Sequence, residues 1–347
     1  MVVAVETPGL REQIEVELAE FQALAEAAGA RVVERIVQRR DALDPATLVG
    51  SGKAHEIAER ARELEAALLL VFNDLRPRQR KNLEKIVPVP IVDRTMLILD
   101  VFARHARSRE GKLQVELAQL RYRQSNLIGA GADLSRLGGG IGTRGPGETK
   151  LEVDRRRISR RVSTLNRELA GVRAQRALRR AAPHHEPLVA LVGYTNVGKS
   201  SLLNALARSD AFVADRPFAT LDPTVRRAFL APRTYARIAD TVGFITDLPH
   251  DLVNAFRATL EELRDADLLV HVLDASNHDW PRQRDAVERL LHDLGVDDKP
   301  RMSVFNKCDL AGNLLPDGNG SVCVSALTGA GIPELREVLA RRIGPRE

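Results

Sequence analysis

The sequence contains only two cysteines, Cys308 and Cys323, and no run of about 18 apolar residues. Two cysteines provide neither a framework of disulfides nor the clustered spacing of a metal site, which is typical of a reducing compartment. The first residues have no basic flank followed by a long apolar centre, so neither a secretory leader nor a membrane span is expected. These absences argue against a disulfide-rich secreted protein and a membrane-spanning protein, and they favour a cytoplasmic location.

Charge is distributed unevenly along the 347 residues, whose net charge is +5. Residues 101–182 carry 19 Lys and Arg against 7 Asp and Glu, a net charge of +12, and the rest of the chain sums to −7. A basic segment between acidic ones predicts a polyanionic partner, with nucleic acid the first candidate. An arginine-rich, solvated helix surface explains the charge equally well.

A glycine-bounded loop follows the apolar run that begins at Leu188 and precedes an apolar helix. The loop matches the pattern GxxxxGKS, in which glycines let backbone N–H groups face a phosphate and the helix N-terminus adds the positive end of its dipole. The Lys199 ammonium is expected to reach the β- and γ-phosphates, and the Ser200 hydroxyl to bind Mg²⁺. A chance match does not explain the strand–loop–helix context. The predicted phosphate-binding residues are Gly193, Tyr194, Thr195, Asn196, Val197, Gly198, Lys199 and Ser200.

Two later motifs predict the switches of a guanine-nucleotide domain. The sequence FATLDPT at residues 218–224 predicts the first switch, with Thr220 the first choice of magnesium ligand and Thr224 the second. A predicted strand ends at Asp240, whose carboxylate is expected in the water shell of the magnesium, and the Gly243 N–H is expected to bond the γ-phosphate. The predicted switch contacts are Phe218, Ala219, Thr220, Leu221, Asp222, Asp240, Thr241, Val242 and Gly243, of which Thr220 and Gly243 join Lys199 as catalytic candidates.

The sequence NKCD predicts recognition of guanine. The Asp309 carboxylate can accept two N–H bonds from guanine N1 and N2, Asn306 can steady the site, and the stem of Lys307 can pack beside the base. After a further predicted strand, the Ala326 N–H is expected to reach the guanine carbonyl oxygen. The predicted base contacts are Asn306, Lys307, Cys308, Asp309, Ser325, Ala326 and Leu327.

Phe244 stands where many small GTPases carry a glutamine that orients the attacking water. A phenyl ring cannot orient water, so we expect slow intrinsic hydrolysis and a catalytic group that comes from elsewhere. Asn196 is similar to the asparagine with which some GTPases bind K⁺ near the phosphates. An asparagine that only stabilises the loop is an equally good interpretation.

The region before this domain alternates between helix and strand and then becomes helical. Residues 1–100 predict a small α/β domain with a partly parallel sheet. Residues 101–182 contain leucines at heptad spacing on two arms, which predicts an antiparallel helical hairpin with its arginines facing solvent. Residues 129–147, of which 8 of 19 are glycine, predict a tip loop that contacts RNA, although a flexible linker is the simpler alternative. We expect a linker at 183–187 and the nucleotide domain at 188–347. The candidate RNA contacts are Arg136, Arg144, Lys150, Arg155, Arg156 and Arg157.

The stretches GGGIGTRGPGETKLEVDRRR, FATLDPT and DTVGFITDLPHDLV together make the chain resemble the HflX family of ribosome-associated GTPases. The resemblance covers nearly the whole chain and implies an α/β P-loop GTPase domain, with a mostly parallel sheet and helices on both faces, behind a small α/β domain and a hairpin. It also implies a monomer that uses Mg²⁺, binds GTP and GDP, and contacts the 50S subunit and its 23S rRNA.

The activity implied by the resemblance is the splitting of stalled or idle 70S ribosomes. A GTP-gated, RNA-binding factor in large-subunit assembly is the alternative, and NKCD disfavours an ATP-using phosphotransferase. The sequence departs from the family where Lys150 replaces a commoner glutamine. It also ends soon after a helix predicted at 332–342, so the further domain of some relatives is expected to be absent.

Overall fold

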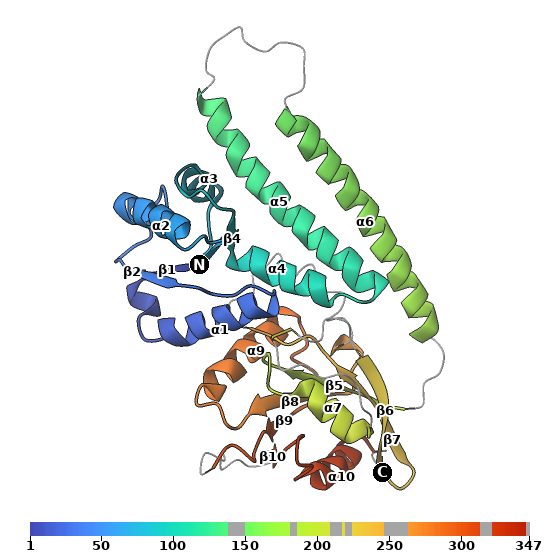
Figure 1. The fold of residues 1–347 in the computed structure, drawn as a ribbon. Coiled ribbons are helices and arrows are strands. Elements are labelled where there is room, and N and C mark those ends of the chain that lie inside the picture. The colour runs from blue at the N-terminus through green and yellow to red at the C-terminus, as the bar shows by residue number, and fades with distance from the viewer. Residues whose placement is uncertain are drawn as a thin grey trace. The chain divides into compact units, whose positions relative to one another are not determined.

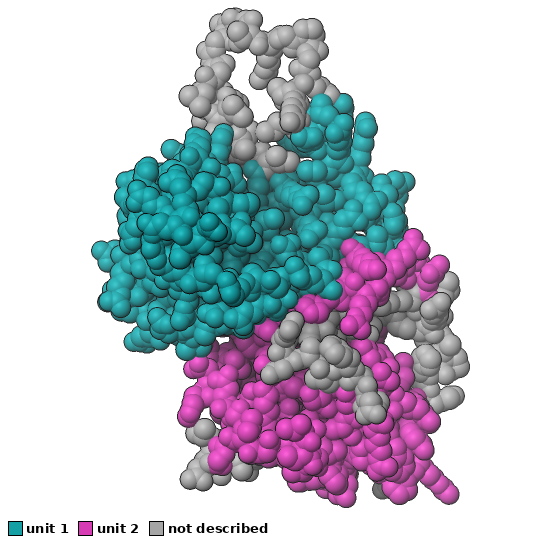
Figure 2. All heavy atoms as spheres, viewed as in Figure 1, with its two compact units in different colours: residues 1–104, 113–170 teal, residues 105–112, 171–347 magenta. Residues whose placement is uncertain are grey.

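The computed structural model describes residues 1–137, 150–180, 186–208, 217–218, 224–245, 263–312 and 321–344. Within them, the side chains of 127–137, 150–151, 173 and 176–180 are not described. The chain divides into two compact units, one of residues 1–104 and 113–170 and one of residues 105–112 and 171–347 (Figure 2). Among the helices described, none is both long and apolar enough to cross a membrane.

The first unit contains a four-stranded parallel sheet with strand order β2-β1-β3-β4. Its strands are β1 (Val2–Glu6), β2 (Arg35–Arg39), β3 (Leu69–Val71) and β4 (Ile91–Asp93). The sequence analysis expected β2, β3 and β4 but missed β1, because it tested the N-terminal apolar run only as a leader. β1 is an interior strand that pairs with β2 and β3, so the sheet is wholly rather than partly parallel.

Helices cover both faces of this sheet (Figure 1). They are a short 3-10 turn (Pro8–Leu10), α1 (Ile14–Ala27), α2 (Ser51–Glu63), α3 (Pro77–Ile86) and α4 (Arg94–His105). The apolar residues of α2 and α3 form one core with Val3, Val5 and Val71. On the opposite face Phe21 of α1 packs edge-on against Phe72, with ring centroids 5.6 Å apart. Alternate residues of each strand thus feed two cores.

Two long helices, α5 (Arg109–Leu137) and α6 (Lys150–Arg180), run side by side as the two arms of a hairpin (Figure 1). Leu117 of α5 and Leu165 and Leu169 of α6 are buried at predicted heptad positions. Arg161 of α6 holds Glu116 of α5 by two hydrogen bonds of 2.7 and 2.8 Å. The hairpin is therefore held by an apolar seam and by charge pairs between the arms.

The expected tip loop is shorter than the sequence suggested. α5 continues to Leu137, so residues 129–137 are helical, although the prediction assigned them to an irregular connection. Two glycines in nine residues cost the helix about 1 kcal/mol each, and the intervening alanines, leucines and arginine favour it. Residues 138–149, which include the rest of the expected loop, lie outside the described residues.

The second unit contains a six-stranded sheet with order β10-β9-β8-β5-β7-β6. Its strands are β5 (Leu188–Gly193), β6 (Thr224–Ala231), β7 (Thr234–Asp240), β8 (Leu268–Asp274), β9 (Arg301–Asn306) and β10 (Val322–Cys323). Only β6 runs antiparallel to its neighbour. Around the sheet pack α7 (Lys199–Ala207), α9 (Trp280–Asp293) and α10 (Ile332–Ile343). The predicted fold class, a mostly parallel α/β nucleotide domain behind a smaller α/β domain and a helical hairpin, is confirmed.

Candidate GTP-binding site

The phosphate loop joins the centre of the sheet to α7. β5 is buried at every position, as expected for an interior parallel strand, and it delivers the loop to the carboxyl edge of the sheet. Gly198 begins α7 with a φ of +89°, and a Cβ on it would lie 2.3 Å from Asn306 Nδ2. Only glycine fits this backbone conformation and this close approach. The N-terminus of α7 thus faces the loop, where a phosphate would meet free N–H groups.

Lys199 is buried within this loop. Its Nζ donates hydrogen bonds to the carbonyl oxygens of Gly193, at 3.0 Å, and Tyr194, at 2.7 Å. Burial lowers the pKa of Lys199 to about 8, and the charge of Asp240 opposes this only in part. The protein therefore holds an ammonium group in an environment that destabilises its charge, and a bound polyphosphate would stabilise that charge.

Oxygen atoms suited to magnesium converge beside Lys199. Ser200 Oγ, at the start of α7, donates a 2.5 Å hydrogen bond to Asp240 Oδ2, at the end of β7. In the sheet register Thr224 lies opposite Asp240. Hydroxyl and carboxylate oxygens are the ligands that Mg²⁺ prefers, so this donor set fits the ion, whose charge would neutralise phosphate oxygens. Ala219, Thr220, Leu221 and Asp222 lie outside the described residues, whereas Phe218 is described and buried.

The second switch is clipped to the phosphate loop through its backbone. The Thr195 N–H donates to the Phe244 carbonyl oxygen at 2.7 Å, and the Phe244 N–H donates to the Gly193 carbonyl oxygen at 3.1 Å. Gly243 lies so close that a Cβ on it would be 2.9 Å from the Thr195 Cα and 3.1 Å from Lys199 Nζ. The sequence analysis considered only the side chain of Phe244 and missed this backbone role.

The other two switch residues that were expected to bind nucleotide serve the structure in this state. Thr241 Oγ1 donates to the Leu191 carbonyl oxygen at 2.7 Å, and both Thr241 and Val242 are buried. Asn196 has a φ of +62°, a conformation that asparagine tolerates better than most residues, and its side chain is exposed.

Asn306 connects the three motifs around the expected guanine site. Its Nδ2 donates to the Val197 carbonyl oxygen of the phosphate loop at 2.9 Å, and its Oδ1 accepts the Ala326 N–H at 3.0 Å. The Ala326 N–H was expected to face guanine, but here it is bonded to Asn306. The Asp309 carboxylate is exposed, and Leu327 is 88% exposed. Ser325 is buried, and its Oγ accepts the Thr328 N–H at 3.1 Å.

Asp274 is a residue of this site that the sequence analysis missed. Its Oδ2 lies 2.7 Å from Lys307 Nζ, and its Oδ1 accepts the N–H and hydroxyl of Ser276. Lys307 itself has a φ of +63°. The ion pair therefore fixes a lysine whose backbone is strained. An acidic residue at the carboxyl end of the buried run LLVHVLD was the available signal.

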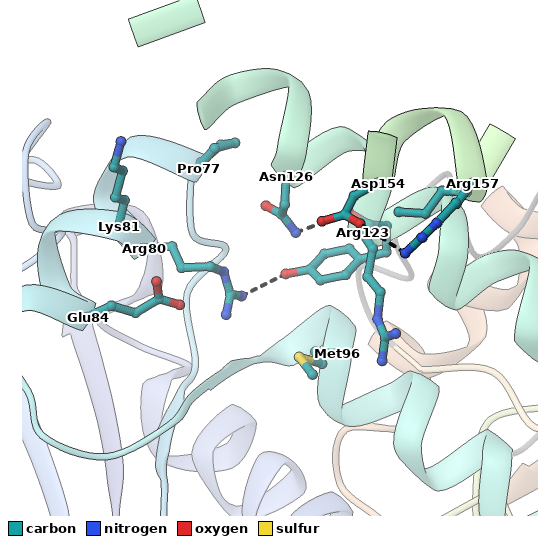
Figure 3. Close-up of a pocket in the computed structure, with 11 residues that line it drawn as sticks. Pro77, Arg80, Lys81, Glu84, Met96, Arg123, Asn126, Asp154 and Arg157 are labelled. Atoms are coloured by element: carbon teal, nitrogen blue, oxygen red, sulfur yellow. Dashed lines mark hydrogen bonds and ion pairs between the residues drawn. The ribbon is translucent and has the colours of Figure 1, made fainter. Parts of the chain in front are cut away.

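The candidate RNA contacts on α6 are exposed at Arg155, Arg156 and Arg157. Arg157 lies 3.9 Å from Asp154 and lines a cavity of about 640 Å³ bounded by α3, α4, α5 and α6 (Figure 3). Arg136 and Lys150 lie in α5 and α6 with side chains that are not described, and Arg144 lies outside the described residues.

A buried polar network beside this cavity ties the hairpin to the N-terminal sheet. The Asp93 carboxylate, at the end of β4, accepts hydrogen bonds from Arg80 Nη2, at 2.6 Å, and from the hydroxyl of Tyr122 on α5. Arg80 also donates to the Ile91 carbonyl oxygen at 2.7 Å (Figure 3). Burial and the Asp93 charge raise the pKa of Tyr122 well above its usual value, so the phenol remains a donor. α5 is thus anchored to the sheet through one carboxylate.

The fold and the connected motifs define a P-loop GTPase. Family models match the chain in sequence order as "GTP-binding GTPase N-terminal" over residues 15–103, "GTP-binding GTPase Middle Region" over 105–182 and "50S ribosome-binding GTPase" over 188–307. A crystal structure titled as the complex of SsGBP and GDP covers 98% of this chain and 97% of its own, with a TM-score of 0.51 and 23% identity, and therefore supports the fold.

Curated relatives establish the family. GTPase HflX of Caldanaerobacter subterraneus subsp. tengcongensis is 48% identical over 329 residues, which cover 94% of this chain and 77% of the relative. GTPase HflX of Escherichia coli K12 is 44% identical over 336 residues, covering 94% and 79%. The chain belongs to the HflX family of GTPases, as the sequence motifs indicated, and it hydrolyses GTP.

Proposed function

We propose that this GTPase binds the large ribosomal subunit in its GTP state and dissociates stalled or idle 70S ribosomes into subunits. The observation that carries the proposal is the exposed arginine surface of α6, at Arg155, Arg156, Arg157 and Arg160, on a chain that also holds a GTPase domain. The family model described as a 50S ribosome-binding GTPase and the HflX relatives support the same partner. The protein would act as a monomer in the cytoplasm, with 23S rRNA as the surface contacted.

The residues expected from the motifs are the proposed GTP contacts. Lys199 would neutralise phosphate charge, Ser200 and Thr220 would bind Mg²⁺, and Asp240 would act through a water molecule. Asp309 would read the guanine edge. A K⁺ ion near Asn196 belongs to the same proposal. Because Phe244 has no group that orients water, intrinsic hydrolysis would be slow and would be stimulated by the ribosome.

The backbone clip between the second switch and the phosphate loop supports a mechanism of gating. A γ-phosphate that bonds the Gly243 N–H must occupy space beside Lys199, where Gly243 and Phe244 now pair with Gly193 and Thr195. GTP would therefore open the clip and GDP would allow it to re-form, which gives the second switch two discrete arrangements.

Co-sedimentation with purified 50S subunits tests the proposal. With a non-hydrolysable GTP analogue the protein should pellet with the subunits, and with GDP it should largely remain in the supernatant. Reversing Arg155, Arg156 and Arg157 to Glu should weaken binding most at physiological salt, because each lost phosphate contact lowers the slope of log affinity against log salt by about 1.

A matched control separates a local surface from net charge. Reversing the three exposed arginines Arg289, Arg341 and Arg342 changes the net charge equally, but these residues lie on α9 and α10 of the nucleotide domain. This variant should bind 50S subunits like the wild type. Equal loss in the two variants, with helical circular dichroism intact, would contradict the assignment of the α6 surface.

A further inference from the structure

The two cysteines of the chain lie against each other at the guanine site. Cys308 is the third residue of NKCD, and Cys323 lies on β10, where its register partner on β9 is Phe305. The Cys323 side chain hydrogen-bonds Cys308, and both cysteines are partly exposed. Two residues distant in sequence are thus brought into contact by the pairing of β9 and β10.

Cys308 also holds the NKCD loop to β10. Its N–H donates to the Val324 carbonyl oxygen at 3.1 Å, and its Sγ approaches the same oxygen at 2.7 Å. Asp309, the proposed guanine acceptor, is the next residue, and Ala326 follows Val324 by two residues. A covalent bond from Cys308 Sγ to Cys323 Sγ would take the Cys308 sulfur away from the Val324 oxygen. The position of Asp309 would then change with it.

We propose that Cys308 and Cys323 form a reversible disulfide that weakens guanine-nucleotide binding, with a glutathione-type disulfide as the oxidant. The proposal rests on the assignment of NKCD to guanine and does not depend on the ribosome. It assigns a modification site to the only two thiols of the chain.

The exchange is balanced in electrons and protons. One cysteine thiolate attacks a sulfur of the oxidant, whose S–S bond breaks and releases one glutathione thiolate. The second cysteine thiolate then attacks the protein sulfur of this mixed disulfide and releases the other glutathione. The two cysteines lose two electrons, which the oxidant gains, and their two protons convert the leaving thiolates to thiols.

The surroundings of Cys308 determine how readily this happens. Burial, and then the neighbouring Cys323, raise the pKa of Cys308 to about 11, so its thiolate is scarce at neutral pH. Disulfide formation should therefore be slow near neutrality and should accelerate as the pH rises. By linkage, bound GDP should hold the reduced form and slow the reaction by the same coupling through which the disulfide weakens binding.

The test uses the full-length protein in a glutathione redox buffer. Oxidation should remove both titratable thiols and lower the intact mass by two hydrogens, without a glutathione adduct. GDP affinity should fall about ten- to a hundredfold, as expected when a charged hydrogen-bond acceptor is displaced, and dithiothreitol should restore it. Circular dichroism of the oxidised protein should match that of the reduced protein.

Cys323→Ser is the control, since Cys323 is outside the proposed nucleotide contacts. The reduced variant should bind GDP like the wild type, and oxidant should not produce the loss of two hydrogens. A wild-type protein that binds GDP equally well with the disulfide formed, or that keeps both thiols in excess oxidant, would overturn the inference alone. Failure of the reduced wild type to bind GDP would overturn the guanine assignment as well.

Discussion

Raising the pH should weaken GTP binding through Lys199. In the nucleotide-free protein its pKa is lowered to about 8 by burial, and its Nζ contacts only neutral loop carbonyls and the more distant charge of Asp240. A bound polyphosphate places several negative charges at the ammonium and raises its pKa again. Binding is then coupled to protonation of this one side chain.

The size of the effect follows from that pKa. Because the bound pKa is higher than the free pKa, binding takes up a proton once the free protein begins to lose it, so affinity is full below about pH 7 and falls as the pH passes 8. With a free pKa of about 8, the affinity should fall about tenfold between pH 7 and pH 9.

Isothermal titration calorimetry in buffers of different ionisation enthalpy measures both the affinity and the protons taken up. Uptake should be near zero at neutral pH and approach one proton at pH 9. Lys199→Arg is the control, because a guanidinium keeps its charge across this range and its profile should lack the Lys199 contribution. An identical pH dependence in wild type and Lys199→Arg, or no proton uptake at pH 9, would refute the role given to Lys199.

Three substitutions test other parts of the site. Lys199→Met should abolish GTP binding yet stabilise the nucleotide-free protein by about 1–2 kcal/mol at neutral pH, since about 3 kcal/mol of charge burial is removed and two hydrogen bonds of about 1 kcal/mol or less are lost; a lower melting temperature would contradict this. Asp309→Asn should weaken GTP binding about ten- to a hundredfold and improve xanthosine triphosphate binding in a fluorescence titration, and unchanged GTP affinity in a folded variant would remove Asp309 from the site. Phe244→Gln should not produce a fast intrinsic rate in a phosphate-release assay, because residue 244 is buried and clipped by its backbone; a variant as fast alone as the wild type with ribosomes would show that this position was misread.

The sequence predicted the nucleotide domain well because its motifs fall at the ends of strongly apolar strands. β5, β8 and β9 appear within a residue or so of the expected positions, and the loop from Gly193 to Ser200 lies where the pattern places it. The spacing of NKCD and of Ser325 and Ala326 predicted contacts at the base. That Asn306 joins these segments to Val197 required the fold, because its two bonds span more than a hundred residues and about twenty.

Other features could not be read from local patterns. The five residues of β1 have the same composition as a short apolar leader segment, and only their pairing with β2 and β3 defines them as a strand. Glycines at 129 and 131 suggested a loop, although tertiary context and the neighbouring residues sustain the helix to Leu137. The anchor formed by Asp93, Arg80 and Tyr122 joins three separate elements, none of which carries a motif.

Light scattering of purified, empty 70S ribosomes tests the central proposal most directly. On addition of the protein with a non-hydrolysable GTP analogue, scattering should fall as 70S particles separate into 50S and 30S subunits, with the protein on the 50S peak of a sucrose gradient. GDP in place of the analogue should leave the scattering unchanged. Intact 70S particles in the presence of the GTP analogue, together with selective binding of the protein to immature large-subunit particles, would contradict a splitting activity and favour a role in assembly.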